Sequence, residues 1–227
     1  MKTASFRLRV RGFTIIELSV SLAIMGMMMV ILLYNYPDTA IRMSLANISH
    51  TTSLLIREAQ VRGSAIDSGN TNLDVDSPIG GYGVYASLID PGHLILFSDF
   101  VDVGGAISNY QIPVGDGLYQ HIGLDETSSI TTFPNGYIIA KLCIWDIPKS
   151  KFVCNGEYSE PIQNLTISFM RPNPEPNIYI NDSKATNFSA GCIELYSPHA
   201  PNPGHIRSVE IFNSGMIRTE VDTCDKS

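Results

Sequence analysis

The sequence has little positive charge beyond its first twelve residues. The chain of 227 residues carries 15 lysines and arginines against 22 aspartates and glutamates. Four of the basic residues, Lys2, Arg7, Arg9 and Arg11, precede residue 12, which leaves eleven basic against 22 acidic residues in the remainder. A domain with this balance repels phosphate backbones. The composition therefore disfavours nucleic-acid binding through a broad basic surface.

Signatures of catalysis and of zinc binding are also missing. The four cysteines form no C-x-x-C pair, and the five histidines show no H-x-x-x-H spacing. The sequence contains no G-x-S-x-G elbow, no phosphate-binding loop and no dinucleotide-binding fingerprint. We therefore expect no enzymatic activity, and a membrane-anchored extracellular enzyme is the class that the sequence supports least.

Three aspartates, Asp99, Asp102 and Asp116, lie in glycine-containing loops. Oxygen ligands on such loops can hold calcium, but the spacing of these three matches no EF-hand loop. Solvated loop acids are the alternative interpretation. Apart from this calcium candidate, we expect no cofactor and no metal.

A long apolar run follows the basic start. Residues 13–34 contain one charged side chain, Glu17, and no proline. As a helix that rises 1.5 Å per residue, they span roughly 30 Å, the thickness of the hydrocarbon core of a bilayer. Because the basic residues precede the run, we expect a single-pass anchor with its N-terminus in the cytoplasm and the bulk of the chain outside.

Three interpretations of the apolar run compete. A cleaved secretory signal would have a shorter core followed at once by a small-x-small site, whereas Ser44-Leu45-Ala46 lies well beyond this run. A plain signal anchor explains the length but not Glu17. A carboxylate near the start of a membrane helix is costly unless it has a partner. The α-amino group of a neighbouring subunit is such a partner, if the chain is cut just before the run.

The sequence RGFTIIE at residues 11–17, with the apolar run behind it, resembles the processing motif of type IV prepilins and type II secretion pseudopilins. The resemblance implies that residues 1–12 are a leader, that a prepilin peptidase cuts after Gly12, and that the same enzyme N-methylates Phe13. It also implies that Glu17 pairs with the methylated amine of an adjacent subunit and fixes the register of assembly. The alternative interpretation of Gly12 is a linker before a membrane helix.

A second helical pattern follows. Because proline removes a helix hydrogen bond, we expect the helix to kink or restart at Pro37, with Asp38 suited to a helix N-terminus. Beyond it, apolar and small residues recur at alternating spacings of four and three, which predicts one face of an amphipathic helix ending near Arg62: Ile41, Leu45, Ile48, Thr52, Leu55 and Ala59. In pilin-like proteins this half of the helix packs under a β-sheet, although any α+β domain could contain such a helix.

From about residue 67, strand patterns alternate with turn residues. Strands are predicted at 82–88, 93–98, 108–112, 118–123, 136–145, 151–154, 163–170, 177–181, 191–197, 205–213 and 216–222. A period of two predicts two sets of side chains that face a core: Ile138, Ala140, Leu142 and Ile144, and Leu165, Ile167 and Phe169.

These patterns predict an α+β fold, in which a pilin-like long N-terminal helix packs on an antiparallel β-sheet domain. We divide the chain into a leader at 1–12, a membrane and assembly helix at 13–36, its amphipathic half at 37–66 and a β-rich globular domain at 67–227.

The cysteines all lie in the part expected outside the membrane, where disulfides are plausible. Cys143 and Cys154 flank a predicted hairpin through residues 146–150, which would leave Cys192 and Cys224 to pair with each other. Four cysteines allow three connectivities, and buried free thiols are a further alternative. Cys143 is expected on the strand face opposite Ile144, outside the main core.

Two further stretches, LLIREAQVRGSAI and IRSVEIFNSGMIRTEV, resemble the end of the long helix and the C-terminal hairpin of H-type pseudopilins. The resemblances imply a structural subunit, in particular a minor pilin or pseudopilin, of a type IV pilus or type II secretion-like filament. Such a subunit starts in the inner membrane of a prokaryote and ends in an extracellular or periplasmic filament.

The partners implied are the prepilin peptidase and N-methyltransferase, other pilin or pseudopilin subunits and the inner-membrane assembly platform. One alternative function is a filament-tip adhesin or substrate-binding module that uses the loops at 99–117 and 171–190. Another is a plain membrane-anchored extracellular domain.

Overall fold

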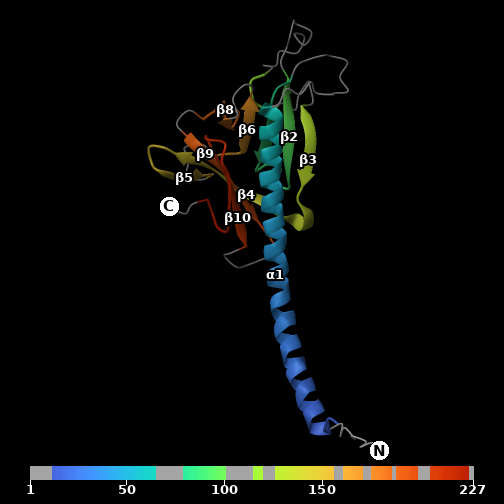
Figure 1. Ribbon diagram of the computed structural model, residues 1–227. Helices are drawn as coiled ribbons and strands as arrows, with labels where there is room; N and C mark the ends of the chain where they lie inside the picture. The colour runs from blue at the N-terminus through green and yellow to red at the C-terminus, as the bar shows by residue number, and fades with distance from the viewer. Residues whose placement is uncertain are drawn as a thin grey trace, which may run out of the picture. The chain divides into compact units, whose positions relative to one another are not determined.

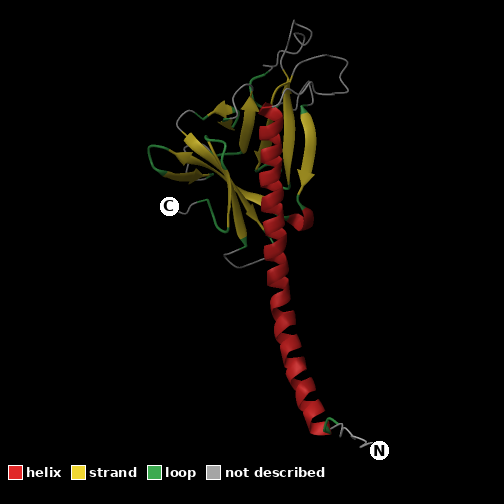
Figure 2. Cartoon of the chain, viewed as in Figure 1, coloured by secondary structure: helices red, strands yellow, loops and turns green. Residues whose placement is uncertain are grey.

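The computed structural model describes residues 12–64, 79–100, 115–119, 126–155, 161–170, 175–185, 188–198 and 205–224. Within these ranges it contains one long helix, a short 3-10 helix and strands that all pair antiparallel (Figures 1 and 2). The chain divides into two compact units, residues 1–40 and residues 41–227.

Helix α1 runs from Ile15 to Ser64. Its segment Ile15–Tyr34, in the first unit, is long and apolar enough to cross a membrane. The helix continues through Pro37 without a break, so the predicted restart at this proline is wrong. A single proline removes one hydrogen bond of the ladder, and its fixed φ is already helical, so the bonds on either side keep the helix intact. The predicted kink at Pro37 stays a prediction.

The strands of the second unit agree closely with the sequence pattern. They are β1 (Ile79–Ser87), β2 (His93–Phe100), β3 (Thr127–Thr132), β4 (Ile138–Asp146), β5 (Lys151–Cys154), β6 (Asn164–Met170), β7 (Pro176–Ile180), β8 (Ser183–Lys184), β9 (Phe188–Tyr196), β10 (Ile206–Phe212) and β11 (Ile217–Glu220), with the 3-10 helix η1 at Pro134–Gly136. The predicted strand 108–112 lies outside the described residues. The predicted strand 118–123 is not a strand at 118–119, and its remainder also lies outside them.

Two strands, β3 and β8, were not predicted. The short β8 has only two residues. The sequence of β3 is TSSITT, and most of its side chains are exposed. Its polar, nearly uniform composition gives no period of two, although three threonines and an isoleucine do favour a strand.

The strands form two sheets where a single sheet was expected. One has the order β3-β2-β1-β6-β7-β8, and the other has the order β11-β10-β9-β4-β5. Residues from both sheets and from the C-terminal half of α1 share one hydrophobic core. The fold is therefore α+β, with the long N-terminal helix that the sequence predicted.

The predicted stripe on α1 faces this core. Leu45, Ile48, Thr52, Leu55 and Ala59 are buried, and Ile41 is half-buried. The helix also approaches the sheet closely near its end, where a Cβ on Gly63 would overlap the backbone carbonyl of Phe169 in β6. A glycine at this position lets the helix and the strand make direct backbone contact.

Strand β4 departs from its predicted face. Ile139, Leu142 and Ile144 lie in the core, whereas Ile138 and Ala140 are half-buried, so the prediction for these last two is wrong. The cause is a register shift opposite β9, where Ile139 pairs with Leu195 and Lys141 pairs with Glu194, leaving Ala140 as the extra residue. A bulge of this kind moves every preceding side chain to the other face. In β6, Leu165, Ile167 and Phe169 are all in the core as predicted.

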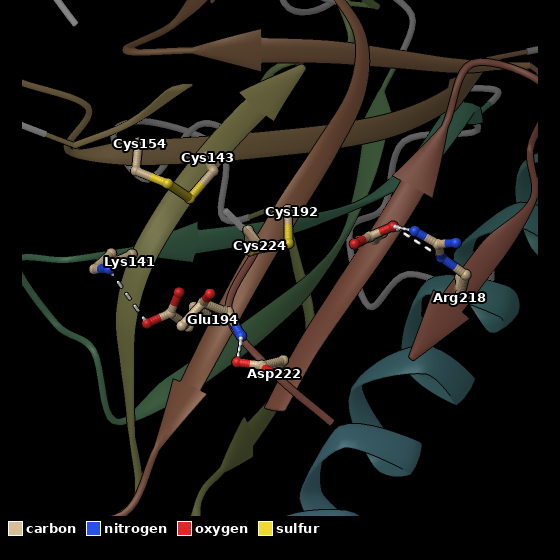
Figure 3. Close-up of a disulfide and its surroundings, with 10 residues drawn as sticks. Lys141, Cys143, Cys154, Cys192, Glu194, Arg218, Asp222 and Cys224 are labelled. Atoms are coloured by element: carbon tan, nitrogen blue, oxygen red, sulfur yellow. Dashed lines mark hydrogen bonds and ion pairs between the residues drawn. A yellow bond between two sulfur atoms is a disulfide. The ribbon is translucent and has the colours of Figure 1, made fainter. Parts of the chain in front are cut away.

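The four cysteines form two disulfides, Cys143–Cys154 and Cys192–Cys224. Cys143 stands in register with both Cys154 on β5 and Cys192 on β9, so both disulfides lie on the same face of the five-stranded sheet (Figure 3). There they form a small second core with Phe152 and Ala190, apart from the main one. The predicted pairing and the predicted place of Cys143 outside the main core are confirmed.

Candidate functional site: the start of helix α1 and a groove on the globular unit

The start of α1 is organised by Thr14 and Glu17. The backbone N–H of Glu17 donates to the Thr14 hydroxyl at 3.3 Å, and the N–H of Leu18 donates to the Thr14 carbonyl at 3.1 Å. A threonine followed three residues later by a glutamate has the form of a capping box, which satisfies N–H groups that the first turn leaves open. Glu17 therefore lies in the first turn, where the helix dipole favours a negative charge.

The hydroxyl groups inside the apolar segment are satisfied within the helix. Ser19 Oγ donates to the carbonyl of Ile16 at 2.9 Å, and Ser21 Oγ donates to the carbonyl of Glu17 at 2.7 Å. Serines bonded in this way place no unsatisfied donor in hydrocarbon. Apart from these hydroxyl groups, the segment Ile15–Tyr34 contains one charged side chain, that of Glu17.

The apolar side chains of this segment are uncovered in the single chain. Each large hydrophobic residue from Phe13 to Tyr34 is more than half exposed, from 52 % at Val20 to 89 % at Ile15. An uncovered apolar surface of this length requires lipid or other helices around it.

A comparison with protein-family models gives one match, the prokaryotic N-terminal methylation motif, at residues 7–33. The chain carries a prepilin methylation motif. Together with the apolar helix, the motif supports a type IV pilin-like protein and a type IV pilin-like filament subunit. No curated protein and no solved structure matches the chain.

The motif implies processing by a prepilin peptidase and assembly with other pilins. In the structure Gly12 and Phe13 precede the first helical turn, and a Cβ on Gly12 would meet no other atom within 4 Å. The cut after Gly12, the methylation of Phe13 and the register role of Glu17 stay predictions. Lys2, Arg7, Arg9 and Arg11, the basic residues of the predicted leader, lie outside the described part of the chain.

The calcium candidates are only partly brought together. Asp99, at the end of β2, accepts hydrogen bonds from the backbone N–H groups of Gly115 (3.0 Å) and Gly117 (2.8 Å). Asp116 lies between these two glycines, while Asp102 is outside the described residues. The Asp99 carboxylate therefore fastens the 115–117 segment. Among the described residues, no three His, Cys, Asp or Glu side chains form a group that could hold a metal ion.

Burial raises the pKa of two side chains that hold the 115–117 segment, Asp99 and Tyr179. Loss of solvent around Asp99 raises the pKa of its carboxyl to about 7, against the hydrogen bond from Gly117 that lowers it, and the charge of Asp116 raises it further. Burial, followed by the charges of Asp116 and Asp99, also raises the pKa of Tyr179, whose hydroxyl donates to the carbonyl of Asp116 at 2.7 Å. The segment is thus held from two strands, β2 and β7.

The outer face of β1, β2 and β3 contains a groove of about 440 Å³. We call it the β1–β3 groove; it is lined by Tyr85, Ser87, Ile89, Asp90, His93, Ile95, Tyr119, Thr127 and Ile130. Tyr85 and Tyr119 pack with their ring centroids 4.9 Å apart, and the Tyr119 hydroxyl lies 2.9 Å from that of Thr127. Its volume is in the range of protein binding sites, roughly 300–1,000 Å³.

Sequence reasoning missed Thr14 and the groove for different reasons. The capping role of Thr14 could have been found, since the pattern T-x-x-E before an apolar run is visible in the sequence. The groove residues come from three strands, the turn between β1 and β2, and the segment 115–119, so they become neighbours only through the sheet pairing. No local pattern indicates such a site.

Proposed function

We propose that this chain is a structural subunit of a type IV pilus or type II secretion-like filament and that its N-terminal helix is the assembly element. The observation that carries the proposal is the coincidence of three features: a methylation motif at residues 7–33, an apolar helix that the chain itself leaves uncovered, and one acid in the first helical turn. A plain membrane anchor needs the first half of the helix but not Glu17 or the motif.

The physical basis of assembly is the exchange of lipid contacts for helix–helix contacts. Cleavage after Gly12 creates an α-amino group at Phe13, four residues before Glu17. In an assembled filament this amine pairs with the Glu17 carboxylate of an adjacent subunit, which neutralises two charges in an apolar environment and fixes the axial register. The chain begins as a single-pass protein of the inner membrane, with its N-terminus in the cytoplasm and its β-rich unit outside.

Within this function, a minor pilin or pseudopilin is the finer proposal. The β-rich unit is larger than a minimal pilin domain, and it carries two disulfides that suit an exported domain. The fraction of this chain in filaments sheared from cells distinguishes a minor from a major subunit, because a minor subunit is present in few copies.

The second candidate function is a binding module at the filament tip, and the β1–β3 groove is the observation that favours it. Binding of glycans, surfaces or secreted proteins by the full chain, lost when the groove is filled by a bulky residue, would support this function.

The decisive measurement for the main proposal is the intact mass of the mature protein. We expect a chain that begins at Phe13 and carries one additional methyl group. A chain that keeps residues 1–12 in cells with an active prepilin peptidase would contradict the proposal, as would a chain cut elsewhere, such as after Ala46.

A further inference from the structure

The hairpin formed by β4 and β5 ends in an exposed aliphatic side chain. Ile147, at its tip, is 53 % exposed, and the tip also contains Pro148 and three polar or charged residues, Lys149, Ser150 and Lys151. The turn is closed by the hydrogen bond from Ser150 N–H to the Ile147 carbonyl, at 3.2 Å, and Ser150 takes a positive φ of 52°. The tip therefore presents Ile147 on a hydrogen-bonded turn.

Two cross-strand links hold the arms of this hairpin. The Cys143–Cys154 disulfide joins β4 to β5, and closer to the tip the rings of Trp145 and Phe152 pack edge to face with centroids 5.1 Å apart. We call the hairpin tip, residues 146–151, the β4–β5 finger. A segment that is ordered before binding loses little conformational entropy when it docks. Within the described residues, β5 is an edge strand, so the finger lies at the border of its sheet.

The finger also has a net positive charge. Lys149 and Lys151 stand against one acid, Asp146, in the segment 146–151, which gives a formal charge of +1. The Lys149 ammonium lies 3.2 Å from the Asp146 carboxylate, and both lysines are exposed.

The β1–β3 groove has the complementary character. Ile89 and Ile130 at its border are 78 % and 58 % exposed, so it presents uncovered apolar surface. Among its lining residues, Asp90 is the one carboxylate, with a side chain that is 69 % exposed and lies 3.4 Å from His93 Nδ1. An apolar groove with a negative border fits an aliphatic side chain on a hairpin tip that also carries two lysines.

Finger and groove cannot meet within one chain. Among the described strands, the groove includes β3, which is the edge of one sheet, and the finger ends at β5, which is the edge of the other. Figure 1 shows β3 and β5 on opposite sides of the C-terminal half of α1. A contact between two different patches on opposite sides of a subunit repeats head to tail, and such a contact builds a ring where the rotation closes and an open helical filament where it does not.

We propose that the β4–β5 finger of one copy docks in the β1–β3 groove of a neighbouring copy in the filament. The inference rests on the proposed function as a filament subunit and names the partner surface of its globular unit. Ile147 enters the apolar groove, and the lysines lie beside Asp90. We expect one hairpin tip in a groove of about 440 Å³ to bury less surface than the roughly 1,000 Å² of a stable interface. It therefore acts only when the N-terminal helices already hold the copies at high effective concentration. One such contact needs only two adjacent copies of the chain. It is therefore compatible with a minor subunit that is present as a few consecutive copies in the filament.

The test is zero-length crosslinking in sheared filaments. Two differently tagged copies of the full chain are expressed together with the assembly machinery, and a carbodiimide couples carboxylates directly to amines in contact. We expect a peptide that joins Asp90 of one copy to Lys149 or Lys151 of the other. Replacing Ile147 by Asp should lower its yield roughly tenfold, as for the loss of a central apolar anchor. Val221→Asp, at an exposed apolar residue outside finger and groove (58 % exposed), should not change the yield.

A charge exchange provides the second arm. Asp90→Lys and Lys149→Asp should each weaken incorporation of tagged copies beside one another, and the double variant should restore it. Filaments of mature wild-type chain without the Asp90 crosslink, or with an unchanged crosslink in Ile147→Asp, would overturn the inference and leave the proposed function intact. Crosslinks from Asp90 to another protein would overturn it equally. Absence of mature chain from filaments would instead refute the proposed function, and this inference with it.

Discussion

Thr14 and Glu17 are joined in the first turn of α1, where the Glu17 amide donates to the Thr14 hydroxyl at 3.3 Å. The carboxylate of Glu17 therefore lies at the positive end of the helix dipole already in the single subunit. Such a placement stabilises a carboxylate by about 0.3–1 kcal/mol at an exposed site. The helix terminus lowers the cost of the acid in the single subunit, and in the proposed filament the amine of a neighbour would neutralise it.

Replacing Glu17 by Ala should permit cleavage and impair assembly. In a filament the change leaves the Phe13 amine without its partner in apolar surroundings, and breaking a buried pair in this way commonly costs about 3–5 kcal/mol. Glu17→Gln, which keeps the size of the side chain but not its charge, should also be cleaved and should also impair assembly. Thr14→Ala is the matched control, because loss of a cap costs only about 1 kcal/mol. Mature mass and content in sheared filaments are measured together. Normal incorporation of Glu17→Ala would remove the register role.

Gly12→Leu should block processing without disturbing the fold. A Cβ at Gly12 meets no atom within 4 Å, so the structure itself tolerates a side chain there. A peptidase, by contrast, needs an accessible extended backbone at the cut, and leucine favours helix where glycine does not. Intact mass should show residues 1–12 retained. Gly26→Ala, which is equally free of neighbours, should be cut normally. A Gly12→Leu chain of wild-type mature mass would show that the cut lies elsewhere.

Much of this architecture could be predicted from the sequence because its signals are periodic and local. The stripe from Leu45 to Ala59 and the core set of β6 were both predicted, since the apolar side chains of each element repeat along one face. In β4 the prediction was confirmed for Leu142 and Ile144 but not for Ile138 and Ala140, because the bulge at Ala140 depends on pairing with β9, which lies some fifty positions further along the chain. The division into two sheets depends on long-range pairing in the same way.

Gly63→Ala should destabilise the globular unit. Alanine is the better helix former by about 1 kcal/mol. However, its Cβ would overlap the Phe169 carbonyl and lie 2.8 Å from Phe169 Cβ, so helix and strand must separate. Overpacking of this kind costs about 1–3 kcal/mol, which outweighs the propensity gain. Denaturant unfolding of the detergent-solubilised chain, followed by the single tryptophan, Trp145, measures the change. Gly92→Ala has no close neighbour and serves as the control; a stabilised Gly63→Ala would contradict the close approach.

Peptide mapping without reduction should recover the two disulfides as Cys143–Cys154 and Cys192–Cys224. Their loops span 11 and 32 residues, so the chain-entropy model predicts losses of about 3 and about 4 kcal/mol when each pair is changed to serine. The Cys192–Cys224 variant should therefore unfold at the lower denaturant concentration. Because Cys143 is in register with both Cys154 and Cys192, a Cys143–Cys192 peptide is the informative alternative. Finding it, or four free thiols in exported protein, would contradict the observed pairing.

Asp99 should make the globular unit less stable as the pH rises from about 4 to about 8. Its folded pKa of about 7 lies above the ordinary value of 3.8, so between these values the folded state binds the proton and the unfolded state does not. The stability it contributes is therefore complete below pH 4 and is lost as the pH rises through 7. One pKa unit corresponds to about 1.36 kcal/mol, so the change amounts to at most about 4 kcal/mol.

The comparison is with Asp99→Asn, which cannot titrate. The variant should be less stable near pH 4, because its amide group places a donor opposite one of the N–H groups of Gly115 and Gly117. This deficit should shrink as the pH rises, because only the wild-type carboxyl ionises. The slope of unfolding free energy against pH is therefore the readout, and it should flatten in Asp99→Asn. Asp182→Asn, at an exposed aspartate in a left-handed turn position that asparagine accepts, should keep the wild-type slope. Equal slopes in wild type and Asp99→Asn would mean that Asp99 is ionised in the folded state across this range, and that its two backbone hydrogen bonds outweigh its burial.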